Sequence, residues 1–179
     1  MNRLLLFILF ILTVSVGYAI PSKILIYGYV ELGNVDQLIS NSRTSPERLN
    51  EVDITVMCGD EVLEEKTNRS SGFYSLVLEP GKVYTLRFSK ENYFQKLIQI
   101  DATEVPSEDQ AASFKLFTDV MLFEETRVED ASSFTLSPMA KCSYNSEKGR
   151  LEWDIDHAKI AFDNFLMVTG YEPSLISEQ

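Results

Sequence analysis

The sequence predicts a mostly β protein: a seven-stranded antiparallel β-sandwich of Greek-key topology, followed by a β-hairpin and one amphipathic helix. The first observation is the segment 72–93, GFYSLVLEPGKVYTLRFSKENY, in which apolar and polar residues alternate around a Pro80-Gly81 turn. Alternation with a period of two is typical of strands that bury one face. The second is that similar runs, separated by turn residues, recur between residues 24 and 123, which favours a sandwich. The third is a helical spacing of apolar residues near the C-terminus.

The seven expected strands share this alternation and are residues 24–30, 53–58, 62–67, 73–78, 84–88, 96–100 and 113–123. Gly28 in the first strand marks a place where a neighbouring backbone can approach closely. Gly59-Asp60 predicts a hairpin turn between the second and third strands. The segment 113–123 is long enough for one last strand or for a bent pair. The alternation does not determine the order of the strands.

The pattern changes after residue 124. Residues 139–144 and 150–154 flank a polar turn and predict a second, small hairpin. The apolar residues that follow at helical spacing are Ile155, Ala158, Phe162, Phe165 and Leu166. Asp154 can cap the start of this helix and Gly170 can end it. An amphipathic helix needs a surface to cover, so we expect the extension 124–179 to pack on the sandwich of residues 20–123 or on a partner.

The N-terminus has the pattern of an export signal. Arg3 precedes an apolar run over residues 4–16, and the small residues Gly17 and Ala19 follow it. We therefore predict that residues 1–19 are removed. The mature chain would then be periplasmic or extracellular, without a transmembrane segment. An uncleaved anchor is the alternative, although the run is shorter than the roughly 20 apolar residues that a span needs.

The chain is strongly acidic, with 27 Asp or Glu against 16 Lys or Arg and a net charge of −11. Such a balance repels nucleic acid and anionic membranes, so we predict neither as a partner. The acidic residues are scattered along the sequence, which is typical of a solvated surface rather than of a dedicated cation-binding face.

The two cysteines of the chain, Cys58 and Cys142, leave two alternatives open. An exported protein meets an oxidising space in which such a pair can form a disulfide. Both cysteines also lie on the apolar side of strand-like runs, where a free thiol packs as a small core residue. A catalytic cysteine is disfavoured, because the chain has a single histidine to activate it.

Residues 24–100 carry a series of strand and turn motifs, which are Gly28-Tyr29-Val30, the strand 53–58, the turn 67–72, Tyr74-Ser75-Leu76, Pro80-Gly81, Tyr84-Thr85-Leu86 and Tyr93. In this order they resemble the carboxypeptidase regulatory-like domain family, which has a prealbumin-like, Ig-like sandwich fold. The resemblance implies a non-catalytic module of the kind found beside exported peptidases and in envelope proteins, notably of the Bacteroidetes. The sequence departs from the family pattern at Ser71 and Asn92, where the family has an acidic residue and a glycine, and in a longer segment 31–51.

Catalytic chemistry has few candidate residues. A zinc hydrolase needs two or three imidazoles, and serine chemistry needs a G-x-S-x-G elbow and a base, whereas the chain has only His157. We therefore predict no enzyme activity and no cofactor, and a hydrolase is the least favoured alternative. The densest set of ligand-type side chains is Asp154, Asp156, His157 and Asp163. A capped, solvated helix end is the preferred interpretation of this set over a metal site.

The polar segment 31–51 is longer than most connections in compact domains, and such loops are often functional. We predict that it contacts a partner, an envelope protein or a carbohydrate, through Asn34, Asp36, Arg43, Glu47 and Arg48. The predicted function is therefore a non-catalytic exported binding or accessory module of the bacterial cell envelope. A calcium-stabilised structural or adhesive protein is the alternative, because carboxylates are in excess.

Four aromatic residues raise a separate question. Tyr27, Tyr29, Phe73 and Tyr93 are candidates for an aromatic ligand face. Packing between the two sheets is the preferred interpretation, because large aromatic side chains commonly fill such cores.

Overall fold

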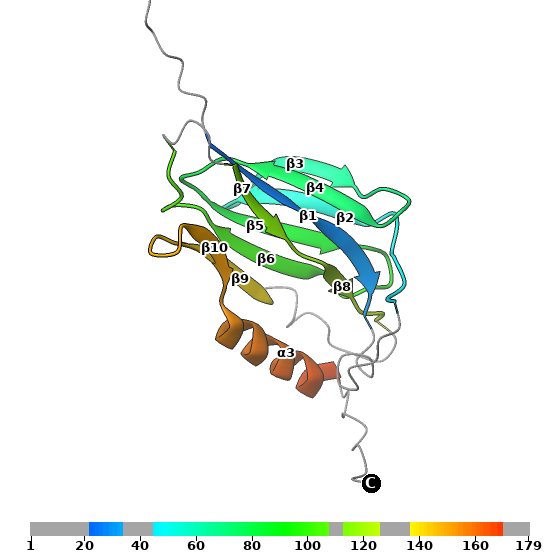
Figure 1. The fold of residues 1–179 in the computed structure, drawn as a ribbon. Helices are drawn as coiled ribbons and strands as arrows, with labels where there is room; N and C mark the ends of the chain where they lie inside the picture. Colours follow the sequence, from blue (N-terminus) through cyan, green and yellow to red (C-terminus); the bar gives the residue numbers. More distant parts are fainter. Residues whose placement is uncertain (1–21, 34–44, 108–112, 126–136, 170–179) are drawn as a thin grey trace, which may run out of the picture.

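The computed structural model describes residues 22–33, 45–107, 113–125 and 137–169. Two β-sheets lie face to face, and one helix lies beside the C-terminal hairpin (Figure 1). The predicted β-sandwich with a C-terminal hairpin and a helix is confirmed. In the described ranges, no helix combines the length and the apolar character that crossing a bilayer requires. The predicted signal segment 1–19 lies outside the described residues.

The larger sheet has six strands in the order β10-β9-β6-β5-β2-β3. Their bounds are Asp53–Cys58 for β2, Glu61–Thr67 for β3, Val83–Ser89 for β5, Lys96–Asp101 for β6, Ala140–Asn145 for β9 and Arg150–Trp153 for β10. The smaller sheet has the order β4-β1-β7, and β8 also pairs with β1. Its bounds are Lys23–Leu32 for β1, Phe73–Leu78 for β4, Ser113–Phe117 for β7 and Val120–Leu122 for β8.

The strand pairing corrects one part of the prediction, because the sheets are mixed rather than antiparallel. β1 pairs in parallel with both β7 and β8, and β6 pairs in parallel with β9. Parallel neighbours need long connections, whereas antiparallel neighbours can share a tight turn. Many residues separate the partners in all three parallel pairs, so the turn residues that predicted the hairpins carry no information about them.

The C-terminal hairpin extends the larger sheet. It adds β9 and β10 to the edge of that sheet beside β6. The segment 113–123 forms two strands, as the bent-pair alternative predicted. β9 and β10, which follow the sequence boundary at residue 124, thus belong to the same sheet as β2, β3, β5 and β6.

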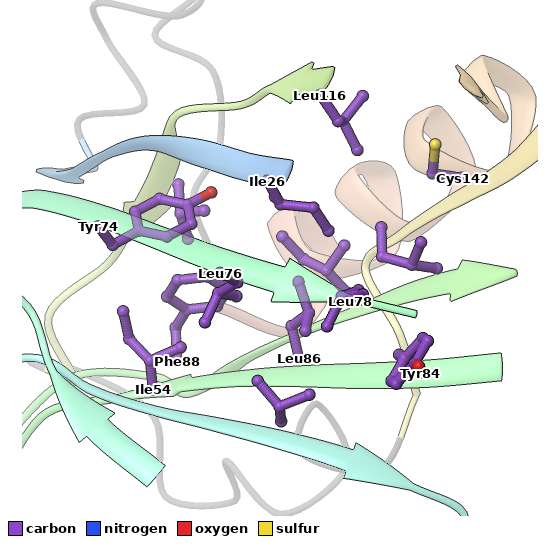
Figure 2. Close-up of a cluster of buried hydrophobic side chains, with 14 of the residues drawn as sticks. Ile26, Ile54, Tyr74, Leu76, Leu78, Tyr84, Leu86, Phe88, Leu116 and Cys142 are labelled. Atoms are coloured by element: carbon purple, nitrogen blue, oxygen red, sulfur yellow. The ribbon is translucent and has the colours of Figure 1, made fainter. Parts of the chain in front are cut away.

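The core lies between the two sheets. In β1, β4 and β5 alternate residues point inward, as the two-residue period predicted, and Figure 2 shows side chains from both sheets converging on one another. The fully buried apolar residues of the core include Ile24, Ile26, Val30, Leu76, Leu86, Phe88, Ile98 and Ile100. Burial of this surface is the main stabilising contribution to such a fold.

The join between β7 and β8 crosses the inner side of β1 at Gly28. The Thr118 N–H donates to the Tyr27 carbonyl oxygen at 3.0 Å, and the Tyr29 N–H donates to the Asp119 carboxylate at 2.9 Å. The Thr118 carbonyl oxygen accepts a hydrogen bond from the Tyr74 hydroxyl at 2.7 Å. Burial, with a smaller contribution from Asp119, raises the pKa of Tyr74, so this hydroxyl keeps the proton that it donates.

The helix α3, Ile155–Thr169, begins as the sequence predicted. The His157 N–H donates to the Asp154 carboxylate at 2.9 Å, which is the geometry of an N-cap. One face of α3 packs in a second apolar cluster around Phe94, Phe123 and Phe165. The predicted terminator Gly170 lies outside the described residues.

Lys96 lies on the core-facing side of β6, opposite Phe88 and two residues before the buried Ile98. The exposure of the whole residue is intermediate, but the ammonium group is desolvated. Burial lowers the pKa of Lys96 from 10.5 to about 8, because a low-dielectric environment disfavours the charged form.

We expect Lys96→Met to stabilise the protein at pH 7 by about 0.5–2 kcal/mol, because methionine fills a similar volume without a desolvated charge. The unfolded chain binds the Lys96 proton more tightly than the folded chain does, so wild-type stability should rise between pH 8 and pH 10.5. The advantage of the variant should shrink over the same interval. Urea unfolding of both proteins at pH 7 and pH 10 measures this, and an unchanged difference would contradict it.

Both cysteines are free thiols in the structure. Cys58 ends β2 and Cys142 lies in β9, and β5 and β6 run between these two strands. Neighbouring strands are about 4.8 Å apart, so three steps separate the residues by roughly 14 Å. The Cα atoms of a disulfide are at most about 7 Å apart. The bridged alternative is incompatible with this sheet, and the free-thiol alternative fits it.

A thiol reagent should therefore label one cysteine of the native protein and both cysteines after denaturation. Cys142 is 2% exposed, and burial raises the pKa of its thiol to about 12, which suppresses the reactive thiolate. Cys58 is partly exposed. Mass spectrometry without reductant counts the labels, and the absence of any label under both conditions would instead indicate a disulfide.

Candidate functional site

The outer face of the smaller sheet carries a group of aromatic side chains. β1 turns Ile24, Ile26 and Val30 toward the core, so the residues between them point away from it. Tyr27 and Tyr29 therefore lie on the solvent side. We use the name aromatic–arginine face for the surface formed by Tyr27, Tyr29, Arg48, Arg69, Phe73 and Phe117.

The four rings form two rows across the sheet. In the first row, Tyr27 lies opposite Phe117 of β7, and their ring centroids are 5.5 Å apart with an interplanar angle of 67°. In the second row, Tyr29 lies opposite Phe73 of β4, with centroids 5.6 Å apart and an angle of 70°. The two tyrosines are two residues apart on one strand, which spaces the rows by about 6.7 Å. Edge-to-face pairs of this kind hold the rings in fixed orientations.

Two arginines accompany the second row of rings. The Arg48 guanidinium lies 3.6 Å from the Tyr29 ring centroid, and that of Arg69 lies 5.6 Å from the Phe73 centroid. Both distances suit cation–π attraction. Arg48 also forms an ion pair with Glu31, with 3.3 Å between Nη1 and Oε1.

Glu31 is a buried carboxylate beneath this face, and its side chain is 4% exposed. Desolvation and the nearby Asp119 raise the pKa of Glu31, while Arg48 opposes the shift. Arg48 therefore offsets part of the free-energy cost of burying the Glu31 charge. The ion pair with Glu31 in turn holds the Arg48 guanidinium over the ring of Tyr29.

Main-chain hydrogen bonds hold Arg48 in place. The Leu32 N–H donates to the Glu47 carbonyl oxygen at 2.8 Å, and the Leu49 N–H donates to the Val30 carbonyl oxygen at 2.8 Å. The end of the predicted partner loop is thus pinned along β1. Of the loop residues proposed from the sequence, the structure describes Glu47 and Arg48, while Asn34, Asp36 and Arg43 lie outside the described residues.

The four aromatic residues proposed from the sequence lie in two different places. Tyr27, Tyr29 and Phe73 lie together on the outer face, so their expected packing between the sheets is wrong. Tyr93 lies elsewhere, and its hydroxyl is 3.3 Å from the Glu124 carboxylate. Sequence reasoning missed Phe117, which is 54% exposed. The alternation carried the needed signal, because Tyr27 and Tyr29 have the opposite parity to the apolar Ile24 and Ile26.

Two lysines lie near the other end of the face. In the register of β1 with β7, Lys115 lies opposite Leu25, and Lys23 lies opposite Ser113. Lys23 and Lys115 are exposed. Within the described ranges, neither lysine nor Arg69 forms an ion pair with a carboxylate. This surface therefore gathers uncompensated positive charge on a chain whose net charge is −11.

A second, acidic surface lies near the turn that precedes β6. An open hollow of about 880 Å³ is lined by the carboxylates Glu51, Asp53, Glu91, Glu124 and Glu125, together with Lys90, Asn92 and Tyr93. Among the described residues, no three carboxylate, histidine or cysteine side chains are arranged so that they could hold a metal ion. The calcium-stabilised alternative therefore gains no site from this surface.

His157 has a role in the helix packing. Its Nε2 atom lies 2.7 Å from the Pro138 carbonyl oxygen. Asp154 is engaged as the N-cap of α3. The histidine thus ties the first turn of α3 to the segment that enters β9.

Comparison with known proteins adds little. No protein-family model matches the chain, and no curated protein matches it. Six chains of solved structures match. One of them, the Bacillus anthracis TIE protein, has a TM-score of 0.39 and 10% sequence identity, and the match covers 59% of this chain and 17% of that chain. The chain thus corresponds to a small part of that protein, and a likeness at this level carries no argument.

Proposed function

We propose that the protein is an exported, non-catalytic binding module of the cell envelope and that it contacts its partner through the aromatic–arginine face. The observation that carries the proposal is the two rows of rings on the solvent side of β1, accompanied by Arg48 and Arg69. Tyrosine and arginine are the residue types that contribute most binding energy at recognition surfaces.

The setting of the face supports this role. β1 is hydrogen-bonded on both sides, to β4 on one and to β7 and β8 on the other. The rings therefore stand on a rigid platform, and a preorganised surface loses little entropy on binding. The predicted partner loop is compatible with this surface, because Glu47 and Arg48 at its end lie beside β1.

The direct test compares the wild type with the double variant Tyr27→Ala/Phe117→Ala. Retention should be measured on immobilised envelope polysaccharides and on fractionated envelope proteins. We expect a loss of affinity of about tenfold or more, since each ring contributes on the order of 1 kcal/mol. Circular dichroism should be unchanged, because both side chains lie outside the core.

The matched control is Val62→Ala, which removes an apolar side chain that is 49% exposed on the edge strand β3 of the other sheet. It should bind like the wild type. If the double variant keeps full affinity, the proposed surface is wrong. If Val62→Ala loses affinity instead, the binding surface lies on the larger sheet.

A further inference from the structure

We infer that the aromatic–arginine face binds an acidic polysaccharide, an extended chain of sugar rings that carry carboxylate groups. The inference rests on the proposed function and names the ligand class of the same surface. Three properties of the face support it: its size, its shape and its charge.

The face is small for a protein partner. Its ring-bearing part spans the three strands β4, β1 and β7, and seven residues of β1 from Leu25 to Glu31. Strand spacings of about 4.8 Å and 3.3 Å per residue give this part an area of roughly 300 Å², to which Arg48 and Arg69 add their side chains. A standard protein interface needs about 800 Å² on each partner. The size of the face suits a few sugar rings.

The shape of the face also disfavours a peptide. Peptides bind to sheets mainly by adding a strand at a free edge, or they occupy a groove between elements. β1 has partners on both edges, so a peptide cannot add a strand directly beside Tyr27 and Tyr29, and only the end strands β4 and β7 offer an edge. A pyranose ring has apolar C–H faces and polar edges, so it can stack on an exposed ring of the first row, Tyr27 or Phe117, whereas the Arg48 guanidinium covers the Tyr29 ring.

Polar groups beside the rings suit the edges of such a sugar. The hydroxyl groups of Tyr27 and Tyr29 make no hydrogen bond to the described part of the chain. A phenolic hydroxyl can both donate and accept, as sugar hydroxyls do. Each tyrosine thus combines an apolar ring with a polar group that no described residue occupies.

The charge of the face selects an acidic ligand. Arg69, Lys23 and Lys115 lie on this side of the sheet without an ion pair. The acidic residues near them are Asp119, which accepts the Tyr29 N–H, Glu31, which is paired with Arg48, Glu79, which is paired with Lys82, and the exposed Glu47. A neutral sugar would gain nothing from this local excess of cations. A carboxylate group on the sugar would be attracted by these cations, and the planar guanidinium of Arg69 matches the two carboxylate oxygens.

The test uses polygalacturonate and its fully methyl-esterified form, which has the same backbone without the charge. Affinity gel electrophoresis and calorimetry should be run at 20 mM and 300 mM NaCl. We expect polygalacturonate to bind at least tenfold more tightly than its methyl ester, and the affinity should fall with salt. Arg69→Gln/Lys115→Gln should weaken binding at least fivefold, whereas Lys159→Gln, which neutralises an exposed lysine on α3, should leave it unchanged.

The remaining outcomes separate this inference from the proposed function. Equal binding of the methyl ester, lost in Tyr27→Ala/Phe117→Ala, would overturn the acidic ligand and keep the face. Equally tight binding of poly-glutamate would show that charge alone is recognised and would overturn the carbohydrate. If no polysaccharide binds but an envelope protein is retained through the face, the inference fails and the proposed function stands. Polyuronate binding that survives the double ring variant would overturn both.

Discussion

Replacing Gly28 with alanine should lower the free energy of unfolding by about 3 kcal/mol or more. A methyl group at this position would overlap the Thr118 carbonyl oxygen and would lie 2.6 Å from its carbon. Both are backbone atoms, so no side chain can rotate away. The strand or the join between β7 and β8 would have to move.

The movement would break specific contacts. The Thr118 carbonyl oxygen lies against β1 at Gly28 and accepts the hydrogen bond of Tyr74. A displaced join would leave this hydroxyl unpaired in the core, at a cost of about 1–3 kcal/mol. The neighbouring Tyr27 and Asp119 contacts that align the aromatic–arginine face would shift with it. Urea unfolding monitored by tyrosine and tryptophan fluorescence measures the effect.

Gly59→Ala is the matched control for this prediction. Gly59 has a φ of 58° but no atom within 4 Å of an added Cβ, so the variant should lose only about 1 kcal/mol, from backbone strain. If Gly28→Ala is no less stable than Gly59→Ala, the join does not cross β1 at this residue.

Replacing Phe165 with alanine should cost about 3–5 kcal/mol, the usual range for removing a fully buried phenylalanine. The Phe165 side chain is 1% exposed, and its ring centroid lies 4.7 Å from that of Phe123 and 5.9 Å from that of Phe94. These partners come from the segments beside β8 and β6. The loss should therefore destabilise the sandwich and α3 together, in one cooperative transition.

Met167→Ala on the same helix serves as the control, because Met167 is 80% exposed and should change the stability by less than about 0.5 kcal/mol. Chemical denaturation followed by far-ultraviolet circular dichroism reports on helix and strands at once. Wild-type stability of Phe165→Ala, or a separate early transition of the helix, would mean that α3 is not part of the same core.

Local features of the fold were predictable from the sequence because they depend on neighbouring residues. The alternation of Tyr84, Leu86 and Phe88 identified their strand and its buried side, and all three side chains are buried. Asp154 was predicted as a helix cap and accepts the expected hydrogen bond. Gly28 was predicted as a point of close backbone approach, which the position of Thr118 confirms.

Long-range features were not predictable in the same way. Parallel pairing of β1 with β7 and β8 joins segments whose sequences carry no turn signal for each other. The contact of Arg48 with Tyr29 and Glu31 likewise depends on where the segment after residue 44 returns to β1. The outward position of Tyr27 follows from the alternation of residues along β1. It was not predicted, because large aromatic side chains were expected to pack between the sheets.

The central claim is that ligands bind on the solvent side of the smaller sheet. Its most direct test is nitrogen-15 chemical-shift mapping of the protein during titration with polygalacturonate oligomers. The claim predicts that the shifted amides gather in β1, β4 and β7 around Tyr27, Tyr29, Phe73 and Phe117. Shifts confined to the outer face of the larger sheet, around Thr55 and Arg87, with β1 unperturbed, would contradict it.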